Sequence, residues 1–294
     1  MTSRDPLPAS DFDILAMPDP SASFVGFLAR YRPHLLPSPV TQAGYLGAPS
    51  WMPSNRAAST EDGLADSAAR IVVAEGTTVL ALRYEGGVVL AGDRRATEGS
   101  FIAHRYIEKV HRTDSHSAVA VAGAAGPALE IVRLFQTELE HYEKVQGVRL
   151  SIAGQANRLA SLVRSHFELA LRGLVVVPVF GGYDEAAGVG RIFKYDLTGG
   201  RYEEREFHAE GSGGRLARSF IKQGFDPSMS KDAAVDLALE ALYEAADEDA
   251  GTGGPDLARG IYPTIATVDS AGFARVPDEE VADRFKRILQ RSRE

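Results

Sequence analysis

The sequence predicts an α+β protein in which sheet layers lie between helix layers, preceded by a flexible arm. Three observations support this prediction. Patterns follow in blocks, as strands, two helices, strands, two helices and strands, rather than as repeated βαβ units. Nine of the 15 prolines precede residue 77. The 294 residues are 44% hydrophobic and 24% charged, which is the composition of a globular protein with a sizeable core.

Residues 1–69 form the predicted arm, because proline removes backbone donors and restricts its neighbours. One island interrupts the arm, where Phe24, Phe27, Leu28 and Tyr31 share a helical face behind Ser23, a residue type that caps helices. Two interpretations remain open, a short docking helix and a stray apolar cluster. A helix of one or two turns needs a partner surface to persist.

Clear strand and helix patterns begin at residue 71. β-Forming residues at 78–84, a glycine turn at 85–87 and an apolar run at 88–92 predict a hairpin. Further strands are predicted at 107–112 and 117–123. Apolar residues at helical spacing then predict two helices, one through Ile131, Phe135, Leu139 and Tyr142 after Pro127, and one through Ala156, Leu159, Val163 and Phe167 after Ser151.

The second half of the chain repeats this order. Strands are predicted at 174–181, 191–196, 203–209 and 263–268, with a turn at 198–200. Helices are predicted at 212–223, at 230–246 and after Pro277. The two helix pairs are expected to cover the outer faces of the sheets.

Composition and charge exclude several classes of protein. The 32 basic and 40 acidic residues give a net charge of −8, which excludes a nucleic-acid binder driven by overall charge. Without cysteine there is no disulfide, thiol nucleophile or Cys-ligated zinc, and a reducing cytoplasm fits this. The longest apolar run, 174–180, is too short to span a bilayer, and residues 1–13 do not resemble a secretory signal. We therefore expect a cytoplasmic protein.

Several familiar catalytic motifs are missing from the sequence. It has no Gly-Lys phosphate loop, no His-Glu-x-x-His helix and no Gly-x-Ser-x-Gly elbow. Residues 247–251 begin like a calcium loop, but Gly251 stands where an oxygen ligand is needed. The seven histidines have no metal-binding spacing, so no metal or cofactor is expected. Taken alone, the segment 75–78 predicts only the start of a strand.

Two segments carry a resemblance to a known family. Residues 76–79, Gly-Thr-Thr-Val, and 86–97, Gly-Gly-Val-Val-Leu-Ala-Gly-Asp-Arg-Arg-Ala-Thr, are similar to the start of a mature catalytic β subunit of the 20S proteasome. Further similar blocks follow in the family's order at 109–110, 121–123, 140–143, 211–213 and 249–256. The last block and the long arm resemble actinobacterial β subunits. The resemblance extends over residues 77–294.

This resemblance implies an N-terminal nucleophile hydrolase with a four-layer αββα sandwich over 77–294 and a propeptide over 1–76. Cleavage between Gly76 and Thr77 would give Thr77 a free α-amine, which can act as the general base for its own hydroxyl. An α-amine has an unperturbed pKa of about 7.7 to 8.0, so part of it is neutral near physiological pH. The uncut chain lacks this amine and is expected to be inactive. The implied function is a threonine endopeptidase that cleaves unfolded polypeptides inside a ring chamber.

Other positions match the family's functional residues one by one. Lys109 matches the active-site lysine, and Asp93 matches its carboxylate partner, with Arg95 in the same network. Gly123 matches the residue whose backbone N–H forms the oxyanion hole. The pair that supports the new N-terminus is matched by Ser212 and Asp249, with Thr252 nearby, where many family members carry serine.

The pocket for the residue before the scissile bond is also matched. Its expected lining is Ala96, Thr97, Ile107, His111, Val121 and Ala125. Small walls leave room for a bulky apolar side chain, so the prediction is a chymotrypsin-like preference. His111 leaves open a broader preference that includes polar residues.

Three other kinds of protein share part of this pattern. The bacterial peptidase HslV also begins with paired threonines, but the Gly-Asp-Arg-Arg segment at 92–95 and the long arm argue against it. A ring subunit without activity would not need the full set of Thr77, Asp93, Lys109, Ser212 and Asp249. A small-molecule amide hydrolase of the same superfamily would lack ring contacts. The resemblance implies as partners an α subunit, copies of this chain in stacked heptameric rings, a ring ATPase and substrates tagged with a ubiquitin-like protein, with neither nucleic acid nor membrane.

Overall fold

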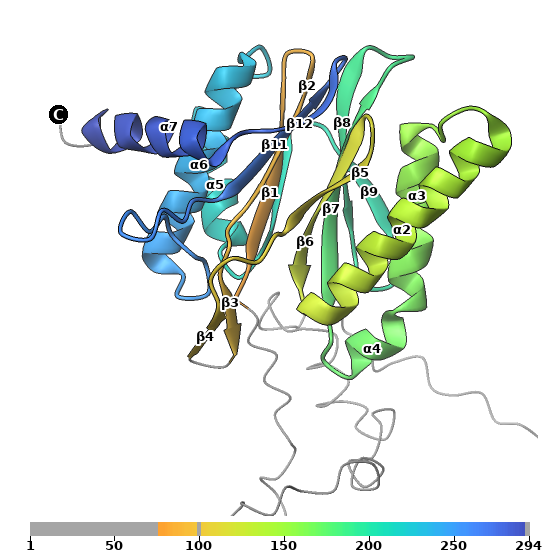
Figure 1. Ribbon diagram of the computed structural model, residues 1–294, viewed down its shortest axis with the longest axis horizontal. Helices are drawn as coiled ribbons and strands as arrows, with labels where there is room; N and C mark the ends of the chain where they lie inside the picture. The colour runs from red at the N-terminus through yellow and green to blue at the C-terminus, as the bar shows by residue number, and fades with distance from the viewer. Residues whose placement is uncertain (1–75, 99–100, 292–294) are drawn as a thin grey trace, which may run out of the picture. The chain divides into compact units, whose positions relative to one another are not determined.

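A computed structural model describes residues 76–98 and 101–291 of the chain. Two five-stranded antiparallel sheets lie face to face between two layers of helices (Figure 1). The predicted four-layer αββα fold is therefore confirmed. The predictions for the arm, including the helix around Phe24 and Tyr31, lie outside the described residues.

The first sheet has the strand order β10-β1-β2-β11-β12. Its strands are β1 (Thr78–Tyr84), β2 (Gly87–Gly92), β10 (Phe207–Gly211), β11 (Thr264–Asp269) and β12 (Gly272–Arg275). Nearly all of β1 and β2 is buried on both faces, which explains their continuous apolar sequences. In the register, Thr78 is opposite Gly211 and Val79 is opposite Gly92, so β1 begins where β2 and β10 end.

The second sheet has the order β5-β6-β7-β8-β9. Its strands are β5 (Val110–Asp114), β6 (Ser117–Gly123), β7 (Val176–Asp184), β8 (Val189–Tyr195) and β9 (Arg201–Glu204). Small and β-branched side chains fill the space between the two sheets, among them Val79, Ala81, Ala118, Ala120 and Val179. Their small volume allows the sheets to pack closely.

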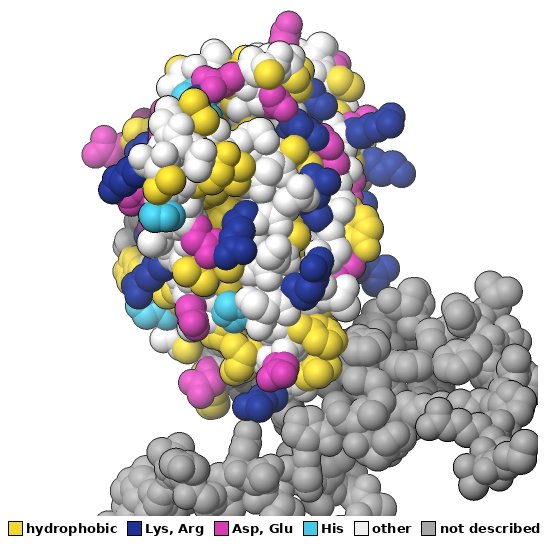
Figure 2. Space-filling view, turned by 90° about the vertical axis from the view of Figure 1, so that its right-hand side faces the viewer, with side chains coloured by type: hydrophobic (Ala, Val, Ile, Leu, Met, Phe, Trp, Pro, Cys, Tyr) yellow, Lys and Arg dark blue, Asp and Glu magenta, His cyan; other side chains and the backbone are white. Residues whose placement is uncertain are grey.

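One helix layer covers the second sheet and consists of α2 (Ala125–Gln146), α3 (Ile152–Ser165) and α4 (Phe167–Leu171). Phe135 of α2 meets Phe180 of β7 edge to face, with ring centroids 5.9 Å apart. Ser151 caps α3 as predicted, since its hydroxyl accepts a hydrogen bond from the backbone N–H of Gly154. Figure 2 shows this side of the molecule, where basic, acidic and apolar side chains are interspersed.

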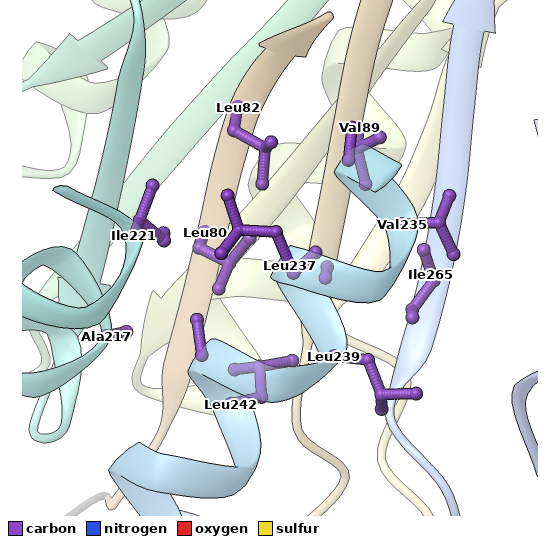
Figure 3. Packing of buried hydrophobic residues seen from close by; sticks show 14 of the residues in the cluster. Leu80, Leu82, Val89, Ala217, Ile221, Val235, Leu237, Leu239, Leu242 and Ile265 are labelled. Atoms are coloured by element: carbon purple, nitrogen blue, oxygen red, sulfur yellow. The ribbon is translucent and has the colours of Figure 1, made fainter. Parts of the chain in front are cut away.

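The other helix layer covers the first sheet and consists of α5 (Gly214–Gly224), α6 (Lys231–Glu248) and α7 (Asp278–Arg291). Leu80 and Leu82 of β1 belong to one buried cluster with Leu239 and Leu242 of α6 and Ile221 of α5 (Figure 3). All five side chains are fully buried. Burial of each stabilises the fold by about 1.5–3 kcal/mol, which fixes which face of β1 points toward the helices.

Several boundaries differ from the prediction. The single strand expected at 203–209 is two strands in different sheets, because the chain crosses from β9 to β10 at Arg205 and Glu206. Phe167 belongs to α4 rather than to the preceding helix. Residues 107–109 precede β5, and their backbone contacts other segments, Ile107 N–H donating to the Arg94 carbonyl. The short strands β3 (Ala96–Glu98), β4 (Phe101–His104) and β12 were not predicted.

Candidate active site

The predicted nucleophile, Thr77, directly precedes β1, and it lines the same cavity as Gly123 at the end of β6. It is 4% exposed. Its carbonyl accepts a hydrogen bond of 2.9 Å from the backbone N–H of Ser212. Gly211 has a φ of 99°, and a Cβ there would lie 1.8 Å from the Thr77 carbonyl oxygen. Only glycine therefore allows this close approach of β10 to Thr77.

Asp93 and Lys109 form a buried ion pair beside the start of β1. The Lys109 Nζ donates to Asp93 Oδ1 and to the backbone carbonyl of Arg95, each at 2.6 Å. The Lys109 side chain is 4% exposed and the Asp93 side chain is 0% exposed. Burial lowers the pKa of Lys109 below its ordinary 10.5, more than the charge and hydrogen bond of Asp93 raise it, and the Arg95 charge adds to the lowering.

The Asp93 carboxylate is also held by backbone N–H groups. Its Oδ1 accepts from Thr78 at 2.8 Å, and its Oδ2 accepts from Arg95 and from Gly253, each at 2.9 Å. With the lysine, four donors surround one carboxylate, which is the arrangement that a buried charge requires. The Arg95 guanidinium donates instead to the Ala250 carbonyl at 3.1 Å, so Arg95 joins the network mainly through its backbone.

A second polar cluster contains the other predicted supporting residues. Asp249 Oδ2 accepts from the hydroxyls of Ser212 at 2.6 Å and Thr252 at 2.5 Å. The Ser212 Oγ in turn accepts from the backbone N–H of Thr77 at 3.2 Å. Burial raises the pKa of Asp249, but the hydrogen bonds from Ser212, Thr252 and backbone N–H groups outweigh it and hold the pKa below the ordinary 3.8. This cluster therefore carries a negative charge at neutral pH.

The two clusters meet around Thr77, although their residues come from distant parts of the sequence. Asp93 follows β2, Lys109 precedes β5, Ser212 follows β10 and Asp249 follows α6. The structure thus brings together all five predicted catalytic residues. Sequence reasoning gave no role to Thr78, whose hydroxyl contacts Thr252 at 2.6 Å, because a β-branched residue at that point indicates only a strand.

Gly123 lies where β6 ends, just before α2 begins. Its φ is 103°, and a Cβ there would lie 2.1 Å from the Val175 carbonyl oxygen. Ala124 donates its backbone N–H to that same carbonyl at 2.7 Å. The position therefore requires glycine for both its conformation and the close approach of the next strand.

A cavity of about 610 Å³ opens beside Thr77, Lys109 and Gly123. All six residues predicted for the pocket line it: Ala96, Thr97, Ile107, His111, Val121 and Ala125. Six further lining residues were missed: Glu98, Ala103, His104, Glu108, Ala128 and Leu129. Ala128 and Leu129 lie one turn after Ala125 on α2, so helical spacing could have identified them. Ala103 and His104 belong to β4, which the sequence did not predict.

His111 is a partly buried titratable group of the pocket. Burial lowers its pKa below the ordinary 6.5, and this outweighs the opposing charge of Glu108 and a hydrogen bond to the Glu108 backbone. The imidazole is therefore neutral at pH 7, and a neutral imidazole has one donor and one acceptor nitrogen. His111 is thus a polar group of the pocket that can bind a substrate donor.

The described part of the chain offers neither a metal-binding cluster nor a membrane-spanning helix. Within residues 76–98 and 101–291, no group of three or more His, Cys, Asp or Glu side chains is placed to hold a metal ion. None of the helices in those residues has both the length and the apolar character needed to cross a membrane.

Comparison with known proteins identifies the family. Residues 73–256 match the model of the family described as "Proteasome subunit". The chain is 54% identical over 232 residues to "Proteasome subunit beta" of Acidimicrobium ferrooxidans, an alignment that covers 78% of this chain and 85% of the relative. It is 48% identical over 269 residues to "Proteasome subunit beta 2" of Thermomonospora curvata, covering 92% of this chain and 88% of the relative.

A third relative, "Proteasome subunit beta" of Acidothermus cellulolyticus, is 50% identical over 272 residues, covering 91% of this chain and 86% of the relative. Residues 77–294 make up only about three quarters of the chain, so the two longer alignments include part of the segment before Thr77. These similarities confirm the family expected from the sequence. The chain belongs to the proteasome subunit family, as a β subunit and threonine endopeptidase of the 20S core, which is assembled with α subunits.

Proposed function

We propose that Thr77 is the nucleophile of this peptidase and that residues 1–76 are a propeptide removed by self-cleavage after Gly76. The observation that carries the proposal is the position of Thr77 between a buried ammonium–carboxylate pair and a hydrogen-bonded Ser212–Asp249 cluster, at the mouth of the cavity. While Gly76 is attached, the Thr77 nitrogen is a peptide amide without a basic lone pair. The precursor therefore lacks a general base for substrate hydrolysis.

Self-cleavage follows from the same groups. The Thr77 Oγ attacks the Gly76 carbonyl carbon, the bond from that carbon to the Thr77 nitrogen breaks, and the hydroxyl proton ends on the nitrogen. Water then hydrolyses the resulting ester, which gives the Gly76 carboxylate and restores the Thr77 hydroxyl. The new α-amine can take the hydroxyl proton in later turnovers, since its unperturbed pKa is about 7.7 to 8.0.

The surrounding residues have separate roles in the proposal. The Lys109 ammonium favours negative charge on the Thr77 oxygen, and Asp93 keeps that buried lysine charged. The Gly123 N–H stabilises the oxyanion of the tetrahedral intermediate, a contribution worth about 2.7–4 kcal/mol per donor in other hydrolases. Ser212 and Asp249 hold the nitrogen of Thr77, with Thr252 and the Arg95 backbone completing the network.

The substrate preference that we propose is chymotrypsin-like, for a large apolar or aromatic residue before the scissile bond. Apolar side chains dominate the cavity, including Ile107, Val121 and Leu129. Lys109 directly precedes β5 and His111 lies within it, and two residues of extended chain span about 7 Å. This distance matches the length of an aromatic side chain that enters beside Lys109. A tyrosine hydroxyl would then reach the neutral His111.

A peptide panel tests this preference in the assembled particle. Fluorogenic peptides that differ only in tyrosine, phenylalanine, leucine, glutamate or arginine before the reporter should be cleaved fastest with the aromatic residues. His111→Val should lower the tyrosine-to-phenylalanine ratio of kcat/KM several-fold while phenylalanine cleavage is kept. Fastest cleavage after glutamate or arginine would refute the apolar preference.

The wider assembly is also part of the proposal. Copies of this chain would form stacked heptameric rings beside α subunits in the cytoplasm, with a ring ATPase that delivers unfolded substrates, some tagged with a ubiquitin-like protein. Enclosure of the sites would explain how a peptidase of broad preference is tolerated in a cell. Native mass spectrometry of the particle purified with its α subunit tests the ring stoichiometry, and any number other than seven β chains per ring contradicts it.

N-terminal processing is the decisive experiment for the nucleophile. The chain is combined with its α subunit, and intact mass and N-terminal sequencing follow the appearance of a chain that begins at Thr77. Thr77→Ala should block processing, whereas Thr77→Ser, which keeps a hydroxyl, should allow it. A Thr77→Ala chain that is still cut after Gly76 would rule out self-cleavage by this residue.

A further inference from the structure

Thr78 is a polar residue with no exposed surface at the start of β1, and the next four residues, 79–82, are all apolar. Its backbone N–H donates to Asp93 Oδ1 at 2.8 Å. Its hydroxyl oxygen lies 2.9 Å from the backbone N–H of Gly213 and 2.6 Å from the hydroxyl oxygen of Thr252. One residue therefore links the Asp93–Lys109 pair to the Ser212–Asp249 cluster.

The number of available protons fixes the direction of each hydrogen bond. Asp249 is a carboxylate with a lowered pKa, so it can only accept, and both Ser212 and Thr252 donate their single hydroxyl proton to it. Thr252 then has no proton for its contact with Thr78, so Thr78 is the donor in that bond. The Thr78 oxygen remains free to accept from the Gly213 N–H.

The Ser212 hydroxyl lies 2.6 Å from the same oxygen, Asp249 Oδ2, and 3.4 Å from the Thr77 carbonyl, so its proton goes to the nearer carboxylate. The Ser212 oxygen must therefore act as the acceptor in its contact with the Thr77 nitrogen at 3.2 Å. Two chains of hydrogen bonds thus converge on Asp249, one from Gly213 through Thr78 and Thr252, the other from Thr77 through Ser212. Thr78 is therefore connected to Ser212 in two ways. Its oxygen accepts from the N–H of Gly213, the next residue after Ser212, and its proton goes to Thr252, which binds the same carboxylate as Ser212.

From this arrangement we propose that Thr78 is a positioning residue of the peptidase, whose hydroxyl keeps the Ser212 oxygen in place to accept a hydrogen bond from the Thr77 nitrogen. The proposal rests on Thr77 being the nucleophile. In addition, Thr78 would orient the Thr77 nitrogen, on which proton transfer depends. A misplaced nitrogen would slow proton transfer without weakening substrate binding, so the expected effect is on kcat rather than on KM.

The test uses Thr78→Val, which keeps the β-branched shape and the backbone N–H to Asp93 and removes only the hydroxyl. Processing of the precursor and kcat of the assembled particle should each fall about tenfold, with KM unchanged within about twofold. Thr78→Ser restores the hydroxyl and should return kcat to within about twofold of the original chain. The matched control is Thr267→Val, a change of another buried threonine in the same sheet.

Thr252→Val interrupts the same chain of hydrogen bonds at its next member. The double variant Thr78→Val/Thr252→Val should therefore be no slower than the slower single variant, because the two residues act through one path. Original kcat in Thr78→Val particles, no rescue by serine, or additive effects in the double variant would each overturn the proposal.

Processing of the variants distinguishes the role proposed for Thr78 from the role proposed for Thr77 as nucleophile. Normal processing of Thr77→Ala would refute the proposed nucleophile, whereas normal processing of Thr78→Val with blocked Thr77→Ala would refute only the role of Thr78. Failure of both Thr78→Val and Thr252→Val to assemble, when Thr267→Val assembles, would assign these hydroxyls a structural role and also overturn the proposal.

Discussion

Replacing Asp93 by asparagine should both destabilise the chain and prevent its maturation. The carboxylate accepts four hydrogen bonds, two on each oxygen, from Lys109 and three backbone N–H groups. The asparagine amide has only one acceptor atom. In one orientation its NH₂ group faces the N–H groups of Arg95 and Gly253, and in the other it faces the Lys109 ammonium. Each buried donor left without an acceptor costs about 1–3 kcal/mol. Removing one partner of a buried ion pair costs about 3–5 kcal/mol.

We therefore expect Asp93→Asn to lower the free energy of unfolding by about 3–5 kcal/mol, a large fraction of the 5–15 kcal/mol typical of a domain. Urea unfolding of the full-length chain, followed by circular dichroism, measures this change, and N-terminal sequencing follows maturation. Asp247→Asn is the matched control, since Asp247 is exposed on α6 and should change stability by less than about 0.5 kcal/mol. A loss below about 1 kcal/mol for Asp93→Asn would refute this account of the pair.

The double variant Asp93→Asn/Lys109→Met separates stability from activity. It removes both buried charges, and replacing a whole buried pair is often close to neutral for stability. The double variant should therefore be more stable than Asp93→Asn and still fail to mature, because the ammonium beside Thr77 is gone. A double variant that is less stable than the single variant would show that the ion pair is not the main source of the loss.

Lys109 and Gly123 each determine a measurable property of the site. Because burial lowers the pKa of Lys109, its ammonium loses its proton at a pH below the ordinary 10.5. The value of kcat/KM should therefore begin to fall on the alkaline side before pH 10.5 is reached. A pH profile that stays flat up to pH 10.5 contradicts the role of the ammonium. In Gly123→Ala, the new Cβ would meet the Val175 carbonyl at 2.1 Å and displace the N–H that we propose binds the oxyanion, so kcat should fall at least about tenfold. Gly126→Ala, where a Cβ meets nothing within 4 Å, should keep its activity.

The strands and helices were largely predictable because their apolar residues repeat at the period of each structure. Leu239 and Leu242 on α6 face the sheet as their spacing indicates. The change of sheet between β9 and β10 was not predictable, since residues 203–209 continue a strand pattern without interruption. What fixes the crossing is a contact with β1, where Arg83 donates its backbone N–H to the Glu206 carbonyl. Such a distant partner leaves no local pattern.

The site was less accessible to reasoning from the residues alone. Thr77 and Ser212 are 135 positions apart, and Asp93 and Gly253 are 160 positions apart. No spacing rule joins residues at such distances, so only the resemblance to a family grouped them. Thr78 was missed for a different reason, because its side chain fits a strand equally well with or without a polar role.

The register of β1 connects the core of the protein to the geometry of the site. Asp93 directly follows Gly92, which is opposite Val79, and Ser212 directly follows Gly211, which is opposite Thr78. A slip of one residue in either pairing would turn every side chain of β1 to the other face and move one of these groups away from Thr77. Leu80 and Leu82 oppose such a slip, because they would leave the helix layer for the tightly packed space between the sheets. The apolar pattern of β1 therefore determines which polar groups surround the residue immediately before it.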